Sequence, residues 1–113
     1  MSTHAVVPPP LVVEATPRAG HQLVVKVCGE LDLLTYGSMR NALDSLCLDG
    51  VDTVRLQLAD LSFCDSRGLR QLLTFVRDGD GADRHMVIED PSPLVHRLLS
   101  LFAPWALDYV PAA

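Results

Sequence analysis

The stretch Thr53-Val54-Arg55-Leu56-Gln57-Leu58, followed by Asp65-Ser66-Arg67-Gly68-Leu69, decides the fold of this 113-residue chain. Polar and apolar residues alternate with period two through the first part, which is typical of a strand with one buried face. After it, apolar residues recur at helical spacing, namely Leu69, Leu72, Leu73 and Val76. The sequence therefore predicts a strand at 53–58 and a helix at 66–78, with Ser66 near the start of the helix.

A hydroxyl at the start of a helix has two interpretations. The first backbone N–H groups of a helix are unpaired and carry the positive end of its dipole, so either Asp65 or Ser66 could simply cap it. The same field stabilises an anion by roughly 0.3–1 kcal/mol. Arg67 and Arg70 oppose the dipole in the first turn but suit a phosphoserine, because guanidinium groups bind phosphate through paired hydrogen bonds. The residues alone leave both roles open.

The other elements alternate between strands and helices. The predicted strands are 11–15, 23–28, 85–89 and 107–110; one helix begins after Thr35 and stops at Gly50, and another runs from Ser92-Pro93 to Pro104. The first of these helices places Tyr36, Met39, Leu43, Leu46 and Cys47 on its apolar face. Strands joined by helical crossovers give an α/β fold, so we expect a mixed sheet of about five strands with helices packed mainly on one face.

Length and composition predict one small domain at residues 11–110. Residues 1–10 end in three prolines and are expected to form a flexible tail. No apolar stretch approaches the length of a membrane span, which predicts a cytoplasmic protein with no membrane contact. The net charge of −5 and the lack of a basic cluster argue against direct nucleic-acid binding.

No motif in the sequence predicts catalysis, a metal site or a cofactor. Cys28, Cys47 and Cys64 are far apart and are expected to be reduced thiols in the core. The four histidines lack metal-ligand spacing, and neither a phosphate-binding loop nor a nucleophile elbow occurs. We therefore expect a binding protein and not an enzyme.

Two segments resemble the signatures of a known family. Gly29-Glu30-Leu31-Asp32, followed about thirty residues later by Asp65-Ser66-Arg67-Gly68-Leu69, is similar to the paired motifs of STAS domains, especially those of bacterial anti-sigma-factor antagonists. The resemblance covers residues 11–110 and implies the open STAS architecture. It also implies that Ser66 is phosphorylated by the partner anti-sigma factor, itself a serine kinase. Arg67 departs from the family pattern, which often has a second hydroxyl residue there, and Gln57-Leu58-Ala59 stands where Asp-Leu-Ser is frequent.

A docking surface is predicted around Ser66. Its members are Glu30, Asp32, Asp65, Ser66, Arg67 and Arg70. The resemblance matches Asp32 to an acid close to the phosphorylated serine, although turn formation and capping are alternative roles for Glu30 and Asp32. Leu101 and Trp105 are interpreted as core residues or, alternatively, as exposed residues that contact a partner or a membrane.

The resemblance implies a phosphorylation-gated regulator that sequesters an anti-sigma factor and so frees a sigma factor for transcription. A serine phosphatase would reverse the modification. Two alternatives remain: a constitutive scaffold subunit of a signalling assembly, in which Ser66 is only a cap, and a nucleotide-binding regulator that holds a ligand phosphate on the first amides of the helix.

Overall fold

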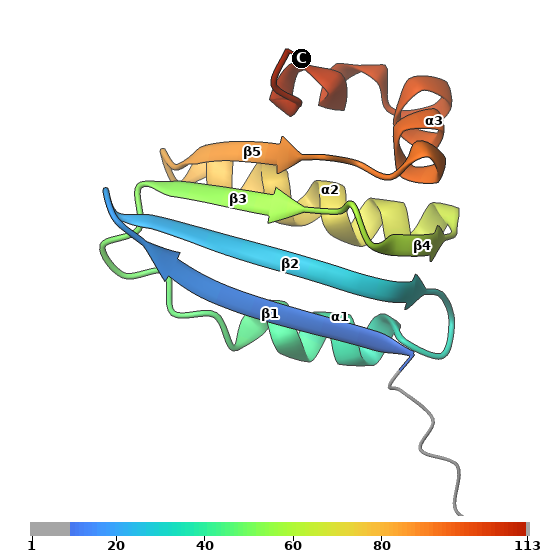
Figure 1. Ribbon diagram of the computed structural model, residues 1–113, viewed down its shortest axis with the longest axis horizontal. Helices are drawn as coiled ribbons and strands as arrows, with labels where there is room; N and C mark the ends of the chain where they lie inside the picture. Colours follow the sequence, from blue (N-terminus) through green and yellow to red (C-terminus); the bar gives the residue numbers. More distant parts are fainter. Residues whose placement is uncertain (1–9, 113) are drawn as a thin grey trace, which may run out of the picture.

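The computed structural model describes residues 10–112, which form five strands, three α-helices and a short 3₁₀ helix (Figure 1). In chain order these are β1 (Leu11–Arg18), β2 (Gln22–Leu31), α1 (Tyr36–Asp44), β3 (Thr53–Gln57), β4 (Leu61–Cys64), α2 (Ser66–Gly81), β5 (His85–Glu89), α3 (Pro93–Phe102) and η1 (Pro104–Tyr109). Except for Pro10, the predicted tail lies outside the described residues. The Pro10 carbonyl accepts a hydrogen bond from Glu30 N at 2.7 Å.

The sheet is mixed, as predicted, with the strand order β1-β2-β3-β5. β1 pairs with β2 in antiparallel fashion, whereas β3 and β5 continue the sheet in parallel. β4 pairs in parallel with the last residues of β2, beyond the stretch that β3 covers, and the register shifts between Gly29 and Glu30. The first part of the long β2 strand therefore pairs with β3, and its last residues pair with β4.

Two predictions about the strands are wrong. Residues 107–110 are not a strand, since residues 104–109 form η1, which begins at a proline and buries Ala106. The fifth strand is β4, which the sequence pattern missed. Its two end residues are buried and its two middle residues are exposed, so the period-two alternation that marks a half-buried strand is absent.

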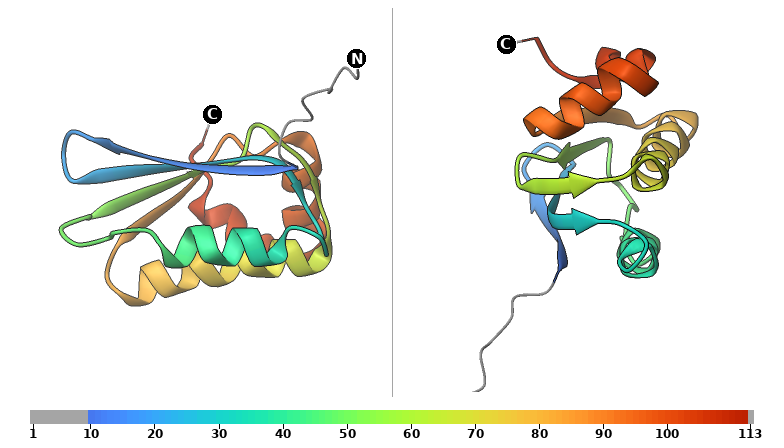
Figure 2. Two further views of the ribbon diagram at one scale, coloured as in Figure 1. Left: turned by 90° about the horizontal axis from the view of Figure 1, so that it is seen from below. Right: turned by 90° about the vertical axis from the view of Figure 1, so that its right-hand side faces the viewer.

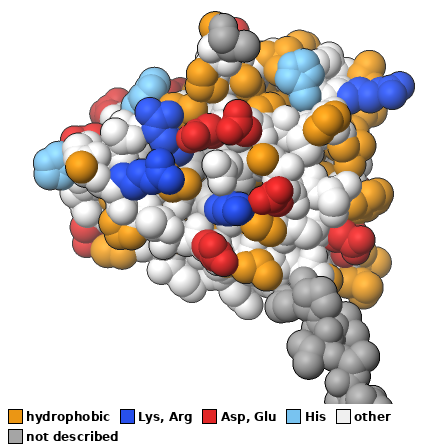
Figure 3. Space-filling view, in the orientation of Figure 1, with side chains coloured by type: hydrophobic (Ala, Val, Ile, Leu, Met, Phe, Trp, Pro, Cys, Tyr) orange, Lys and Arg blue, Asp and Glu red, His pale blue; other side chains and the backbone are white. Residues whose placement is uncertain are grey.

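The helices α1 and α2 cover one face of the sheet (Figure 2), while α3 packs against β4 and η1 against β5. Alternate strand residues such as Val25, Leu56 and Ile88 are buried beneath these helices. The opposite face carries mixed charged and apolar side chains (Figure 3), including a 3.2 Å ion pair between Lys26 and Asp60. The prediction of helices mainly on one face is confirmed. Across the described part of the chain, no helix combines the length and the apolar character that a membrane span needs.

Both helices on the covered face have different ends from those predicted. α1 stops at Asp44, so Leu46 and Cys47 lie outside it. Conversely, α2 continues to Gly81, beyond the end predicted at residue 78. A side chain at Gly79 would collide with the sulfur of Met86 on β5, so glycine allows the end of α2 to pack directly on the sheet.

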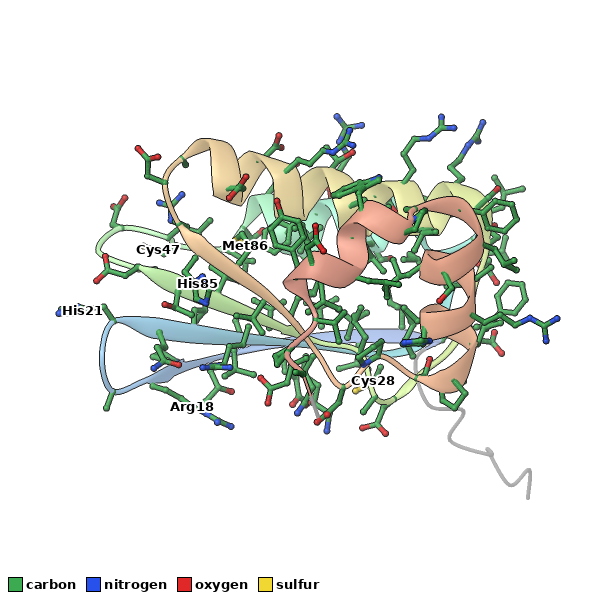
Figure 4. All side chains as sticks on the ribbon, turned by 90° about the horizontal axis from the view of Figure 1, so that it is seen from above. Arg18, His21, Cys28, Cys47, His85 and Met86 are labelled. Atoms are coloured by element: carbon green, nitrogen blue, oxygen red, sulfur yellow. The ribbon has the colours of Figure 1, made fainter. Side chains whose placement is uncertain are left out.

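The cysteines are only partly the core thiols that the sequence predicts. Cys64 is buried, and burial raises the pKa of its thiol to about 12. Cys28 is partly buried, but Cys47 is exposed because α1 ends before it. Figure 4 shows Cys28 and Cys47 in different parts of the molecule.

Candidate functional site

Ser66 is the exposed first residue of α2, at the edge where β2 and β4 both end. Parallel pairing brings the carboxyl ends of these two strands together, and Asp65 N donates to Leu31 O at 3.2 Å. The predicted proximity of Asp32 to the Ser66 segment follows from this pairing.

Asp65 is the cap of α2. It has extended backbone angles, and its Oδ1 atom accepts a 2.8 Å hydrogen bond from Gly68 N in the first turn. This arrangement satisfies one of the unpaired amides at the start of the helix. The two interpretations of Ser66 are thereby separated: capping belongs to Asp65, and the hydroxyl of Ser66 lies at the first helical position, open to solvent.

Tyr36 supports the cap from α1. Its hydroxyl donates to Asp65 Oδ2, and the guanidinium of Arg67 lies 5.8 Å from the centre of its ring. Desolvation and the bond to Asp65 raise the pKa of Tyr36 to about 12. Desolvation also acts to raise the pKa of Asp65, but hydrogen bonds from Tyr36 and from the amides of Gly68 and Arg67 outweigh it and lower that pKa. Asp65 is therefore an anion beside Ser66.

This role of Tyr36 could not be predicted from the sequence, because its spacing places it on the apolar face of α1. The hydroxyl meets a carboxylate 29 residues away in the chain. No local pattern encodes such a pair.

Gly68 lets the first turn of α2 press against the end of β2. A Cβ atom built at Gly68 would lie 2.7 Å from Leu31 Cγ and 3.0 Å from Leu31 O. Leu31 is fully buried, so it has little room to move. The glycine of the signature segment thus fixes how closely Ser66 approaches the loop that follows β2.

That loop uses Asp32 as a turn residue. Asp32 Oδ1 accepts from Leu34 N at 3.0 Å, while the buried Thr35 hydroxyl donates to Glu30 O at 2.8 Å and accepts from Asp32 N at 2.9 Å. The alternative assignment of Asp32 to turn formation is therefore confirmed. Glu30, by contrast, has an exposed side chain next to the same edge.

The two arginines of the first turn lie in different surroundings. Arg70 shares with Ser66 a hollow of about 310 Å³ between α2 and the α3–η1 segment, which Phe102 and Trp105 also line. Arg67 is absent from that lining and lies instead over Tyr36. Of Arg67 and Arg70, Arg70 is thus the one that lines the same hollow as Ser66, together with Arg77 farther along α2.

Exposed apolar side chains gather at the end of the molecule that carries Ser66. Among residues 10–112, the large apolar side chains with high exposure are Leu33 (73%), Leu34 (88%), Phe63 (46%), Leu101 (63%) and Phe102 (67%). They come from the loop after β2, from β4 and from the last turn of α3, elements that meet at this end (right panel of Figure 2). We call these five residues and Ser66 the Ser66 face.

Of the five apolar residues of this face, only Leu101 was named from the sequence as a candidate contact. Trp105 is partly buried against the core, and the guanidinium of Arg77 covers its ring at 4.0 Å. The adjacent pair Leu33-Leu34 was the available signal, since two consecutive leucines in a turn interrupt the polar composition expected there.

Comparisons with known proteins agree with this geometry. A family model described as "Mlab, STAS domain" matches residues 14–103. An anti-sigma F factor antagonist of Lysinibacillus sphaericus is 27% identical over 89 residues, which is 76% of either chain. The fold is similar to that of an anti-sigma factor antagonist from Mycobacterium paratuberculosis (TM-score 0.77, 19% identity, 96% of this chain and 92% of that one). It is also similar to the Bacillus cell fate determinant SpoIIAA in its phosphorylated form (TM-score 0.67, 19% identity, 90% and 91%). The chain belongs to the STAS domain family.

Proposed function

We propose that this protein is an anti-sigma factor antagonist whose binding is switched by phosphorylation of Ser66. In the unmodified state it binds an anti-sigma factor and so leaves a sigma factor free for transcription. The anti-sigma factor is the serine kinase that modifies Ser66, and a serine phosphatase restores the binding form.

The observation that carries this proposal is an exposed serine at the end of the molecule where large apolar side chains are also exposed. Asp65 already caps α2, so the Ser66 hydroxyl is not needed for the helix and is accessible to a kinase. Exposed apolar patches are characteristic of protein-binding surfaces. The similarity to a relative named an anti-sigma F factor antagonist supports the choice of partner.

Electrostatics explain why a phosphate would switch this surface off. A phosphoserine adds about −1.5 to −2 charges, and the anionic Asp65 lies next to it. A partner that covers the Ser66 face would have to desolvate that charge among leucines and phenylalanines. If the mismatch costs about 3 kcal/mol, the affinity falls on the order of a hundredfold.

Calorimetric titration of a candidate anti-sigma factor with variants at Ser66 tests the switch. Ser66→Ala should bind like the unmodified protein, whereas Ser66→Asp should bind far more weakly. Ser38→Asp is the matched control, because Ser38 is also an exposed serine in the first turn of a helix, here α1. Equal affinities for all three variants would contradict gating at Ser66 and favour the constitutive scaffold, whereas equal loss in both Asp variants would indicate a general charge effect.

Phosphorus NMR can test which arginine meets the phosphate. A cation near the phosphate dianion lowers its second pKa. Since Arg70 shares a hollow with Ser66, Arg70→Ala should raise that pKa more than Arg67→Ala does. The reverse order, or no change in either variant, would contradict this assignment and leave the arginines as partner contacts.

A further inference from the structure

A second concavity lies between α1 and α2, outside the Ser66 face. Both helices begin at the same end of the sheet, but α1 ends at Asp44, whereas α2 runs on to Gly81 (left panel of Figure 2). The end of α2 therefore extends past the end of α1. An open cleft of about 520 Å³ lies between the two helices, lined by residues of both.

The interior of this cleft is apolar. Its floor reaches the buried side chains of Val54 and Met86 on the sheet, and Leu43, Leu48 and Phe75 form its walls. The volume lies within the range of about 300–1,000 Å³ that is typical of small-molecule sites. Methionine and phenylalanine in the lining allow an apolar chain to pack closely.

One end of the cleft is positively charged. Arg67 and Arg70 line it at the start of α2, whereas Arg40 of α1, which also lines the cleft, lies 4.0 Å from Asp44 at the end of its own helix. Arg67 and Arg70 carry no ion pair among the described residues, whose salt bridges involve other groups. In a chain with a net charge of −5, this local excess of cations is complementary to an anion.

The opposite end differs in its charge. The guanidinium of Arg84 donates hydrogen bonds to Val51 O at 3.2 Å and to Leu48 O at 3.0 Å, so these donors are not available to a ligand. The carboxylate of Asp78 lines the same end of the cleft. The α2 residues that line the cleft extend from Arg67 to Gly79, which is roughly 18 Å along a helix. An anionic group is therefore favoured at the Arg67 end and disfavoured at the Asp78 end.

We propose that this cleft binds an amphiphilic anion, that is, a single apolar chain with a carboxylate or phosphate head group. The head group lies between Arg67 and Arg70, and the chain follows Phe75 toward Met86. A slender chain fits better than a partner protein, because the lining descends to buried sheet residues and the exposed apolar side chains expected of a protein-docking surface lie on the Ser66 face instead.

Titration of the full-length protein with decanoate, decyl phosphate, decanol and decyltrimethylammonium, followed by two-dimensional NMR, tests the proposal. Decanoate or decyl phosphate should bind at least tenfold more tightly than decanol, and the cationic amphiphile should bind least. The comparison of the two anions identifies the preferred head group. Amide shifts should concentrate on α1 and α2, including the signals of Leu43 and Phe75.

Variants at exposed positions of the cleft provide the second arm. The double change Arg67→Gln and Arg70→Gln, and separately Thr74→Glu, should each reduce anion affinity at least tenfold, whereas Arg97→Gln on α3 is the matched control and should leave it unchanged. Equal binding of decanoate and decanol, shifts confined to the Ser66 face, or insensitivity to the arginine changes would overturn the proposal. None of these readouts depends on an anti-sigma factor, so this result is independent of the proposed function.

Discussion

Gly68→Ala is the most direct test of how the chain positions Ser66. Gly68 lies in the first turn of α2, and an added Cβ would meet Leu31 Cγ at 2.7 Å and Leu31 O at 3.0 Å. Leu31 O belongs to the backbone of β2, and the Leu31 side chain is fully buried. Neither group can therefore move aside without disturbing the packing around it. The substitution should push the start of α2 away from the end of β2.

Two effects of opposite sign determine how much Gly68→Ala changes the free energy of unfolding. Alanine is favoured over glycine within a helix by about 1 kcal/mol. Overpacking against a fixed neighbour costs about 1–3 kcal/mol. The net expectation is a loss of stability of up to about 2 kcal/mol relative to the native protein.

Gly37→Ala is the matched control, because Gly37 lies in the first turn of α1 and a Cβ there would meet nothing within 4 Å. It should be neutral or stabilising by up to about 1 kcal/mol. In urea denaturation, where m is about 1–3 kcal/mol/M, the midpoints of the two variants should differ by about 1 M. Equal midpoints would refute the steric argument, since helix propensity alone treats both glycines alike.

Three further results are expected. Because the pKa of Asp65 is lowered in the folded state, its stabilising effect is complete above the ordinary carboxyl value of 3.8 and is lost as the pH falls through the folded-state pKa. Thermal melts from pH 6 to pH 2 should therefore show a smaller acid-induced loss in Asp65→Asn than in the native protein, and parallel losses would count against this role. Tyr36→Phe should lower the midpoint of urea denaturation and raise the Asp65 pKa in an NMR titration, because the bond from the Tyr36 hydroxyl helps to hold that pKa down; an unchanged carboxyl pKa would show that the hydroxyl does not support the cap. With a thiol reagent, Cys47 should react at once and Cys64 only on unfolding, because Cys64 is buried and its pKa is raised to about 12.

The strand–helix junction could be predicted from sequence because its information is local. Alternation at 53–58 and helical spacing from Leu69 onward correspond to β3 and α2. The paired signature segments also indicated that Asp32 and Ser66 belong to one region, and β2–β4 pairing brings their segments together.

Long-range contacts explain what the sequence did not reveal. β4 is recognisable only through its pairing with β2. Its four residues have buried ends and an exposed middle, so buried and exposed positions do not alternate as they do in a half-buried strand. Residues 107–110 have strand-like composition, yet residues 107–109 form the end of a 3₁₀ helix that begins at Pro104, and Val110 follows that helix. Likewise, the exposure of Phe102 depends on where α3 ends, which no amphipathic pattern specifies.

The identity of the cap bears on where a phosphate on Ser66 would point. A free helix N-terminus attracts an anion through its unpaired amides, but here Asp65 already accepts the hydrogen bond from Gly68 N. Since two neighbouring anions repel each other, a phosphate on Ser66 should turn away from Asp65 and the helix amides. The remaining directions are Arg70 in the adjoining hollow and the exposed apolar side chains of the Ser66 face. The same carboxylate that stabilises α2 would therefore direct the added charge toward the surface that a partner must cover.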